Sequence, residues 1–176
     1  FKPLSTLESP ALLGAEFSLP AAPALLPDAA TVVLDRLQDA GNVGAILRSA
    51  AAFGVRQVLA LKGTAALWAP KVLRAGMGAH FGLQLIEGLA ADDLDALRVP
   101  LVATSSHAMA PLHRAALPSP CAWVMGHEGQ GVSEALLARC PLTVSIPQPG
   151  GEESLNVAAA AAICLYESER RRSEQG

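Results

Sequence analysis

The sequence predicts one α/β domain, built on a mostly parallel sheet with helices on both faces. From residue 31 onward, short apolar segments alternate with helix-forming segments, which is the order found when helices connect parallel strands. Several strand segments are continuously apolar, as strands covered on both faces are. No internal repeat recurs along the chain, which excludes a repeat array.

The first thirty residues contain five prolines. We expect residues 1–30 to form a linker or extended arm, with a short strand over 15–19, because proline interrupts regular structure. The domain proper covers residues 31–176. Its expected elements are a strand at 31–35, a helix at 43–53, a strand at 57–62, a helix at 70–75, a strand at 83–87, a helix at 92–97, strands at 100–105 and 121–126, a helix at 133–139, a strand at 142–147 and a helix at 154–172.

Composition excludes several classes of protein. Hydrophobic residues make up 51% of the chain and charged residues 16%, which is too apolar for a disordered chain. Charges, Gly and Pro interrupt every apolar stretch before it reaches the roughly 18–20 residues that span a bilayer. The first 28 residues do not resemble a signal peptide. We therefore expect a soluble, cytoplasmic protein, whose three widely spaced cysteines are reduced and buried.

The charge balance argues weakly against a large nucleic-acid footprint. The net charge is −3 and the isoelectric point is about 5.8, whereas neutralising phosphates requires clustered Lys and Arg. One such cluster occurs at 170–172, with Glu167 and Glu169 beside it. We interpret that cluster as a solvated helix end that complements the helix dipole.

The first of three motifs covers residues 38–54 and joins a strand to a helix. Asn42 and Gly54 have a sufficient structural explanation as helix caps. Arg48 does not, because the helix around it is otherwise uncharged and is expected to be buried on most sides. A guanidinium in that position needs a partner.

The second motif, at 124–131, follows the strand at 121–126. Gly126, Gly129 and Gly131 permit positive φ and a close approach of the backbone to a ligand. Their spacing differs from that of a dinucleotide fingerprint. Glu128 is the one carboxylate in this turn, and an exposed loop charge and a functional group are equally good interpretations of it.

The third motif, at 145–167, joins a strand to a Pro- and Gly-rich loop and a long Ala-rich helix. Ser154 is a good N-cap for that helix, and Glu152 and Glu153 suit its dipole. This structural explanation leaves out Asn156. A polar amide in the first turn of an apolar helix suggests a group presented to a ligand.

Other chemistries lack their motifs. The sequence has no nucleophile elbow, no phosphate-binding P-loop and no pair of zinc-binding histidines on a helix. The four histidines are scattered, and each is better explained as a surface or satisfied polar residue than as a metal ligand. We expect no metal.

Taken together and in this order, the motifs resemble those of the SpoU (TrmH-like) class of the SPOUT superfamily, over about residues 31–170. Ala40 replaces a common proline, Gln148 a methionine and Ala158 a serine. The matching residues are Asp39, Asn42, Gly44, Arg48, Phe53 and Gly54 in the first motif, Gly126, Glu128 and Gly131 in the second, and Ile146, Pro147, Gly150, Ser154, Leu155, Asn156 and Val157 in the third.

The resemblance implies an enzyme that uses S-adenosylmethionine to methylate a ribose 2′-hydroxyl in ribosomal or transfer RNA. It also implies a deep C-terminal trefoil knot, which binds the cofactor, and a homodimer with the active site near its interface. Arg48 would activate the 2′-hydroxyl, and the other catalytic residues would be Asn42, Glu128, Ser154 and Asn156. The residues that would bind the cofactor are Thr104, Ser105, Gly126, Ile146 and Leu155.

The resemblance also implies that the arm is the remnant of a missing N-terminal RNA-binding domain, so this chain would bind S-adenosylmethionine well and RNA poorly. Two alternatives stay open. An inactive RNA-binding or ribosome-assembly module of the same fold would differ in its calorimetric response to S-adenosylmethionine. An unrelated α/β enzyme that uses a nicotinamide or nucleotide would be identified by its bound cofactor.

Overall fold

The computed structural model describes residues 18, 23–150 and 155–174. Apart from Ser18, the strand expected at 15–19 lies outside these residues. The observed elements are β1 (Thr31–Leu34), α1 (Ala40–Ala52), β2 (Gln57–Leu61), α2 (Pro70–Gly76), the 3₁₀ helix η2 (Ala79–Gly82), β3 (Gln84–Leu89), the 3₁₀ helix η3 (Ala91–Ala96), β4 (Leu101–Thr104), β5 (Ala110–Pro111), β6 (Ala122–Met125), α3 (Glu134–Leu137), β7 (Leu142–Ser145) and α4 (Val157–Glu174).

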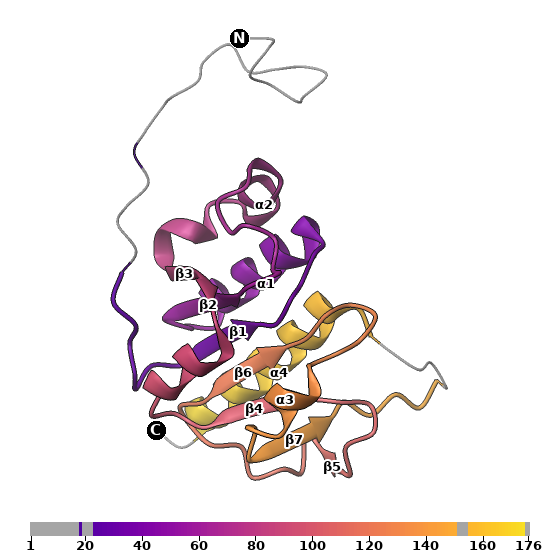
Figure 1. Cartoon of the computed structure of the whole chain (residues 1–176). Helices are drawn as coiled ribbons and strands as arrows, with labels where there is room; N and C mark the ends of the chain where they lie inside the picture. The colour runs from indigo at the N-terminus through magenta and orange to yellow at the C-terminus, as the bar shows by residue number, and fades with distance from the viewer. Residues whose placement is uncertain (1–17, 19–22, 151–154, 175–176) are drawn as a thin grey trace.

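The strands form one sheet in the order β3-β2-β1-β6-β4-β7-β5 (Figure 1). Every pairing between these strands is parallel, which confirms the predicted α/β class. β5 is a two-residue edge strand that carries no sequence signal of its own. The chain leaves β1 toward β2 and β3, and later returns to the other side of β1 through β6. Parallel sheets bind ligands at the carboxyl ends of strands where the order changes direction in this way.

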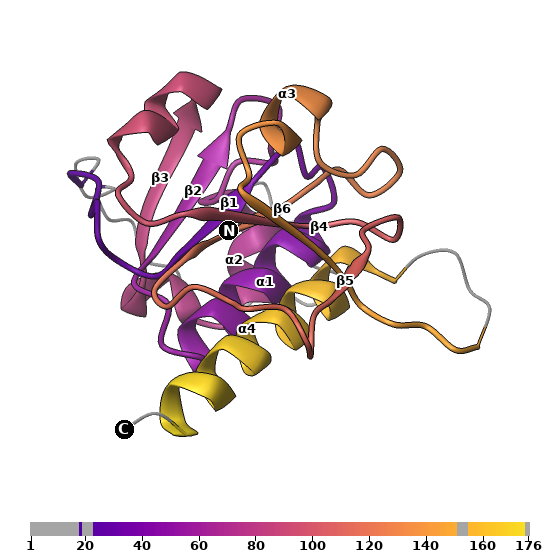
Figure 2. The same ribbon diagram turned by 90° about the horizontal axis from the view of Figure 1, so that it is seen from below.

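Helices cover both faces of the sheet, as predicted (Figure 2). Alternate side chains of β1 point to opposite faces, so Val32 and Leu34 belong to one core and Val33 to the other. α1, α2 and α4 pack over the first core, which also contains Trp123. The second core is covered by η3 and the short α3. The segment expected as a helix at 92–97 instead forms the 3₁₀ helix η3 at Ala91–Ala96.

Both long helices begin at other residues than expected. Asp39 is the N-cap of α1, because its Oδ1 accepts a hydrogen bond from the backbone N–H of Asn42 at 2.7 Å. α4 begins at Val157, where the Oδ1 of Asn156 accepts from the N–H groups of Ala158 and Ala159 at 2.9 and 3.2 Å. The expected cap, Ser154, lies outside the described residues. A side-chain amide thus provides the cap that the sequence analysis assigned to a hydroxyl.

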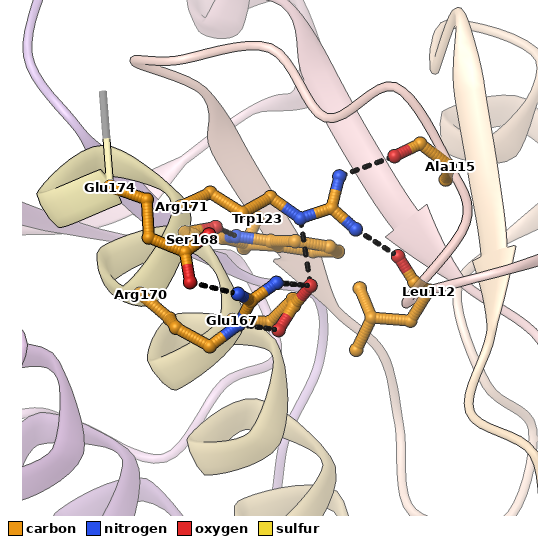
Figure 3. Close-up of polar contacts among 8 residues, drawn as sticks. All are labelled: Leu112, Ala115, Trp123, Glu167, Ser168, Arg170, Arg171 and Glu174. Carbon is orange, nitrogen blue, oxygen red and sulfur yellow. Dashed lines mark hydrogen bonds and ion pairs between the residues drawn. The ribbon is translucent and has the colours of Figure 1, made fainter.

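The arginine cluster at the end of α4 is a paired network rather than a solvated helix end (Figure 3). Glu167, which is 9% exposed, accepts from Arg170 Nε at 2.9 Å and from Arg171 Nε at 2.7 Å. The guanidinium of Arg171 also donates to the carbonyl groups of Ala115 and Leu112. The network therefore attaches the loop before β6 to α4.

The predicted trefoil knot stays a prediction, because the chain enters α4 through residues 151–154, which lie outside the described part. Within the described residues, no helix combines the length and the hydropathy required to cross a membrane. The three cysteines are free thiols. Cys121 and Cys164 are buried as expected, whereas Cys140 is only partly buried.

Candidate active site

The predicted site residues follow the carboxyl ends of neighbouring strands. β6, β4 and β7 lie side by side in the sheet, so the loops that begin at Gly126, Ser105 and Ile146 start at one edge. The loop after β1 reaches the same edge, because β1 is parallel to β6 and next to it. One edge of the sheet thus gathers all three motifs.

A series of hydrogen bonds joins one residue from each motif. Glu128 Oε1 accepts from Asn42 Nδ2 at 3.3 Å. Asn42 Oδ1 in turn accepts from Asn156 Nδ2 at 2.9 Å. These three residues come from the loop after β6, the first turn of α1 and the cap of α4. Asn42 connects the other two, since an amide donates from its nitrogen while its oxygen accepts.

Glu128 is held by the loop in front of α1. Its carboxylate accepts from the backbone N–H of Asp39 at 3.1 Å and of Gln38 at 3.4 Å. Burial alone raises the pKa of Glu128, but hydrogen bonds from its own backbone N–H, from Asp39 and from Asn42 outweigh that effect and lower it. Glu128 is therefore ionised at neutral pH and only accepts hydrogen bonds. Its charge fixes the orientation of the Asn42 amide.

Gly126 is required by the fold of its own loop. A Cβ added there would lie 2.1 Å from the backbone nitrogen of Val132 and 2.2 Å from the carbonyl carbon of Gly131. The loop folds back because the Gly131 N–H donates to His127 O at 2.8 Å. Of the three glycines in this motif, Gly131 alone has a positive φ, of 69°. The close backbone approach expected at Gly126 is thus to the protein itself.

Arg48 does not join this series. It is exposed, and within the described residues it has no hydrogen bond or ion pair. The Arg48 guanidinium is therefore exposed, and the partner expected for it from the sequence is not found among the described residues. Residues six positions apart on a helix point about 120° away from each other, so Arg48 and Asn42 face different directions on α1. The chain presents its guanidinium to the outside.

The loops predicted to hold the cofactor contain an unused polar group. Within the described residues, the buried Oε1 of Gln148 has no hydrogen-bond partner, and buried acceptors are normally satisfied. Gln148 lies in the loop after β7, next to Ile146. Thr104 and Ser105 are half-buried at the end of β4, and Leu155 is exposed beside the cap of α4. A ligand with a donor group at this edge would fit Gln148.

Three contributions were missed by the sequence analysis. Asp39 was matched as a motif residue, but its capping role was assigned to Asn42. Gln148 was noted only as a replacement for methionine. The role of Asn156 as a cap could have been found from its position before the apolar run, where Asn is a favoured cap. Within the described residues, no group of three or more His, Cys, Asp or Glu side chains could hold a metal ion.

A cavity lies at the opposite edge of the sheet, near the amino ends of β1 and β6. It is lined mainly by apolar groups, including Phe53, Val55 and Trp123. None of the predicted site residues lines it. This cavity and the polar motif residues are therefore in different places, and we assign the site by the polar residues.

Comparison with known proteins gives one consistent family. The model of the SpoU rRNA Methylase family matches residues 29–166. The chain is 36% identical over 138 residues to the 23S rRNA (guanosine(2553)-2′-O)-methyltransferase RlmP of Bacillus subtilis, a match that covers 77% of this chain. It spans 56% of the length of that relative.

Two solved structures are similar to this chain over most of its length. A TrmH-family protein from Porphyromonas gingivalis superposes with a TM-score of 0.88 at 38% identity, covering 97% of this chain and 70% of that one. The SpoU methyltransferase AviRb from Streptomyces viridochromogenes, in complex with the cofactor AdoMet, gives 0.81 at 31% identity, covering 89% and 67%. Both likenesses extend over most of the described fold.

Proposed function

Because the chain belongs to the SpoU rRNA methylase family, we propose that it transfers a methyl group from S-adenosylmethionine to a ribose 2′-hydroxyl of RNA. The observation that carries this proposal is the hydrogen-bonded series Glu128–Asn42–Asn156. These hydrogen bonds hold the three motifs together at one edge of the sheet. Turns and helix caps without a shared function are not expected to come together in this way.

Arg48 is the residue we assign to the reacting hydroxyl. A ribose hydroxyl is a very weak acid, so positioning and stabilisation of the developing oxyanion are the main tasks. An arginine side chain stays protonated in proteins. It therefore acts as a hydrogen-bond donor to the oxygen rather than as a base, and the hydroxyl proton passes to water as the O–CH3 bond forms and the bond from sulfur to the methyl group breaks. Its exposure leaves it free to meet a large substrate.

We propose that the pocket beside the cofactor is formed by Asn42, Glu128 and Asn156. The motif match adds Ser154 to this group. S-adenosylmethionine, when bound, supplies the electrophilic methyl group. We propose that Thr104, Ser105, Gly126, Ile146 and Leu155 hold it, mainly through their backbone groups. The unsatisfied Gln148 Oε1 supports this location, because it offers an acceptor where a ligand would bring donors.

We propose ribosomal or transfer RNA as the substrate, with 23S rRNA as the first to test. The support comes from relatives: RlmP is named for 23S rRNA, and another solved structure of this fold is described for methylation of tRNA. The cytoplasm is the compartment that this substrate and the three free thiols favour. Mapping 2′-O-methyl groups by mass spectrometry, in RNA from a strain with and without the gene, identifies the nucleotide.

We further propose that the protein works as a homodimer. Ile163 and Tyr166 are exposed on α4 by 39% and 55%, and Ala159 is exposed on the same helix. Leu155, which is 39% exposed, lies just before the helix begins. Spacings of four and three residues put Ala159, Ile163 and Tyr166 on one face of this helix. A second copy would cover this apolar stripe.

The first prediction concerns Arg48→Ala. We expect methyl transfer to fall by at least about a hundredfold, the scale seen when a donor to a developing oxyanion is removed. Affinity for S-adenosylmethionine, measured by calorimetry, should stay unchanged, since Arg48 has no hydrogen bond or ion pair with the cofactor loops among the described residues. Transfer of labelled methyl groups to rRNA from the deletion strain provides the activity measurement.

Arg56→Ala is the matched control, because Arg56 is also exposed and precedes β2 at the opposite edge of the sheet. It should retain full activity. Full activity of Arg48→Ala would contradict the assignment. A wild-type chain that binds no S-adenosylmethionine would instead favour the inactive module.

A further inference from the structure

Charge is strongly separated along this chain. Residues 40–86 contain five Lys and Arg residues and no Asp or Glu, so this segment carries +5 and the rest of the chain carries −8. The segment forms α1, β2, α2 and η2, toward the β3 end of the sheet (Figure 1). The acidic net charge conceals a cationic region in the fold.

Three of these cations lie around the contact between α1 and α2. Lys71 and Arg74 are exposed and three residues apart, so they share one face of α2. α2 packs closely on α1, because a Cβ added to Gly44 would lie 2.4 Å from the Cβ of Ala75. Arg48 is one turn beyond Gly44 on the same side of α1. Arg48 therefore lies on the side of α1 that faces α2.

Two large apolar side chains are exposed just beyond α2. Met77 is three residues beyond Arg74 and is 73% exposed, and Phe81 in η2 is 80% exposed. Aromatic side chains among cations are the arrangement that binds single-stranded nucleic acid, because bases stack on the ring while the cations meet phosphates. Exposure of Phe81 has no structural benefit within the chain itself.

The cations of this surface are also available. Within the described residues, Lys71, Arg74 and Arg48 have no ion pair. Six other arginines are paired with carboxylates, among them Arg98 with Asp28 and Arg139 with Asp95. Arg56 and Arg114 have no ion pair among the described residues. The first acidic residue after the segment, Glu87, accepts a hydrogen bond from the Leu67 backbone N–H.

We propose that Lys71, Arg74, Met77 and Phe81 form the surface that receives the RNA substrate next to Arg48. Lys71 and Arg74 contact phosphates, and Phe81 stacks on an unpaired base. This inference rests on the proposed function, since Arg48 is the group assigned to the ribose. A protein partner fits less well, because protein interfaces are depleted in lysine and a surface without acidic groups repels other cationic proteins.

The test measures binding of a fluorescein-labelled, single-stranded RNA of mixed sequence by anisotropy over a range of salt concentrations. The double variant Lys71→Gln/Arg74→Gln should lower the slope of log affinity against log salt by about 1.4, since each contact to a single-stranded phosphate contributes about 0.7. Phe81→Ala should weaken binding by about tenfold with an unchanged slope, because it removes stacking and no charge.

Arg56→Gln/Arg114→Gln is the matched control. It removes two exposed cations, one before β2 and one between β5 and β6, and should leave both slope and affinity unchanged. Affinity for S-adenosylmethionine should be equal in all variants, which also shows that they are folded. Wild-type affinity and slope in the α2 variants would overturn the inference, as would a wild-type chain that binds no RNA at the lowest salt. Methyl transfer by Arg48→Ala tests the proposed function separately.

Discussion

At the scale of single residues, Asn42 and Asn156 each lie at the start of a helix and in the hydrogen-bonded series that joins the three motifs. The Oδ1 of Asn156 caps α4 while its Nδ2 donates to Asn42. Asn42 lies in the first turn of α1 and bridges to Glu128. One amide side chain of Asn156 therefore caps a helix and also takes part in the hydrogen-bonded series. A sequence argument that chooses between the two explanations misjudges such residues.

Gly126 allows a sharp prediction at this scale. We expect Gly126→Ala to lower the free energy of unfolding by about 2–3 kcal/mol, because the new methyl group collides with backbone atoms that cannot rotate away. The distance to Val132 N would be 2.1 Å. Urea denaturation at neutral pH measures the change.

Gly129→Ala serves as the control in the same loop. A Cβ there meets nothing nearer than the His127 ring at 3.9 Å, so stability should change by less than about 0.5 kcal/mol. Equal effects of the two substitutions would show that the loop rearranges freely around position 126.

The sequence predicted which residues of the site gather, but not how they contact one another. Asn42, Glu128 and Asn156 were identified because polar side chains are scarce around them. In the structure, Glu128 contacts Asn42 and two backbone N–H groups. Those backbone groups have no sequence signature, since every residue except proline carries one.

At the scale of elements, the strands were predicted well and the helix ends poorly. Apolar runs located β1, β2, β4, β6 and β7, because burial on both faces leaves little freedom of composition. Helix starts depend on single cap contacts, and so Asp39 and Asn156 replaced the expected caps. The arginine cluster was misjudged because its acceptors include the carbonyl groups of Leu112 and Ala115, about 55–60 residues away in the chain.

The network on α4 gives the prediction for this scale. Hydrogen bonds from Arg170 lower the pKa of Glu167 to about 2 from its ordinary 4.5, and those from Arg171 add to the effect against burial, which raises it. We expect Glu167→Gln to cost about 2–3 kcal/mol of unfolding free energy at pH 7, because it removes one partner from a largely buried pair.

The pH dependence follows from the sign of that shift. A carboxyl whose pKa is lowered on folding stabilises the protein fully above its unfolded value and loses this effect as protons bind. The difference between wild type and Glu167→Gln should therefore shrink as pH falls from about 4.5 to about 2. Glu174→Gln is the control, since Glu174 pairs with Arg170 alone and is 64% exposed. A difference that is constant with pH would contradict the ionic role of Glu167.

At the scale of the whole molecule, the apolar stripe on α4 predicts association. Ile163→Glu should weaken the dimer by more than about tenfold, because an unpaired charge would be buried in the interface. Sedimentation at several protein concentrations measures it. Met109→Glu is the control, since Met109 is 95% exposed and lies off the stripe.

Two results would contradict this prediction. One is a wild-type chain that sediments as a monomer at every concentration. The other is an Ile163→Glu variant that dimerises as tightly as the wild type.

The aromatic contact between Tyr166 and Phe53, with ring centroids 6.0 Å apart, links the stripe to the end of α1.

The separation of charge along the sheet gives the molecule a dipole moment that its net charge of −3 does not describe. Near a polyanion, such a molecule experiences a torque that turns its cationic α2 end toward the polyanion and its acidic part away from it. The molecule is thereby oriented before it contacts the polyanion, and a larger fraction of collisions is productive. An acidic protein can thus approach RNA with its reactive side leading, and salt should slow that approach.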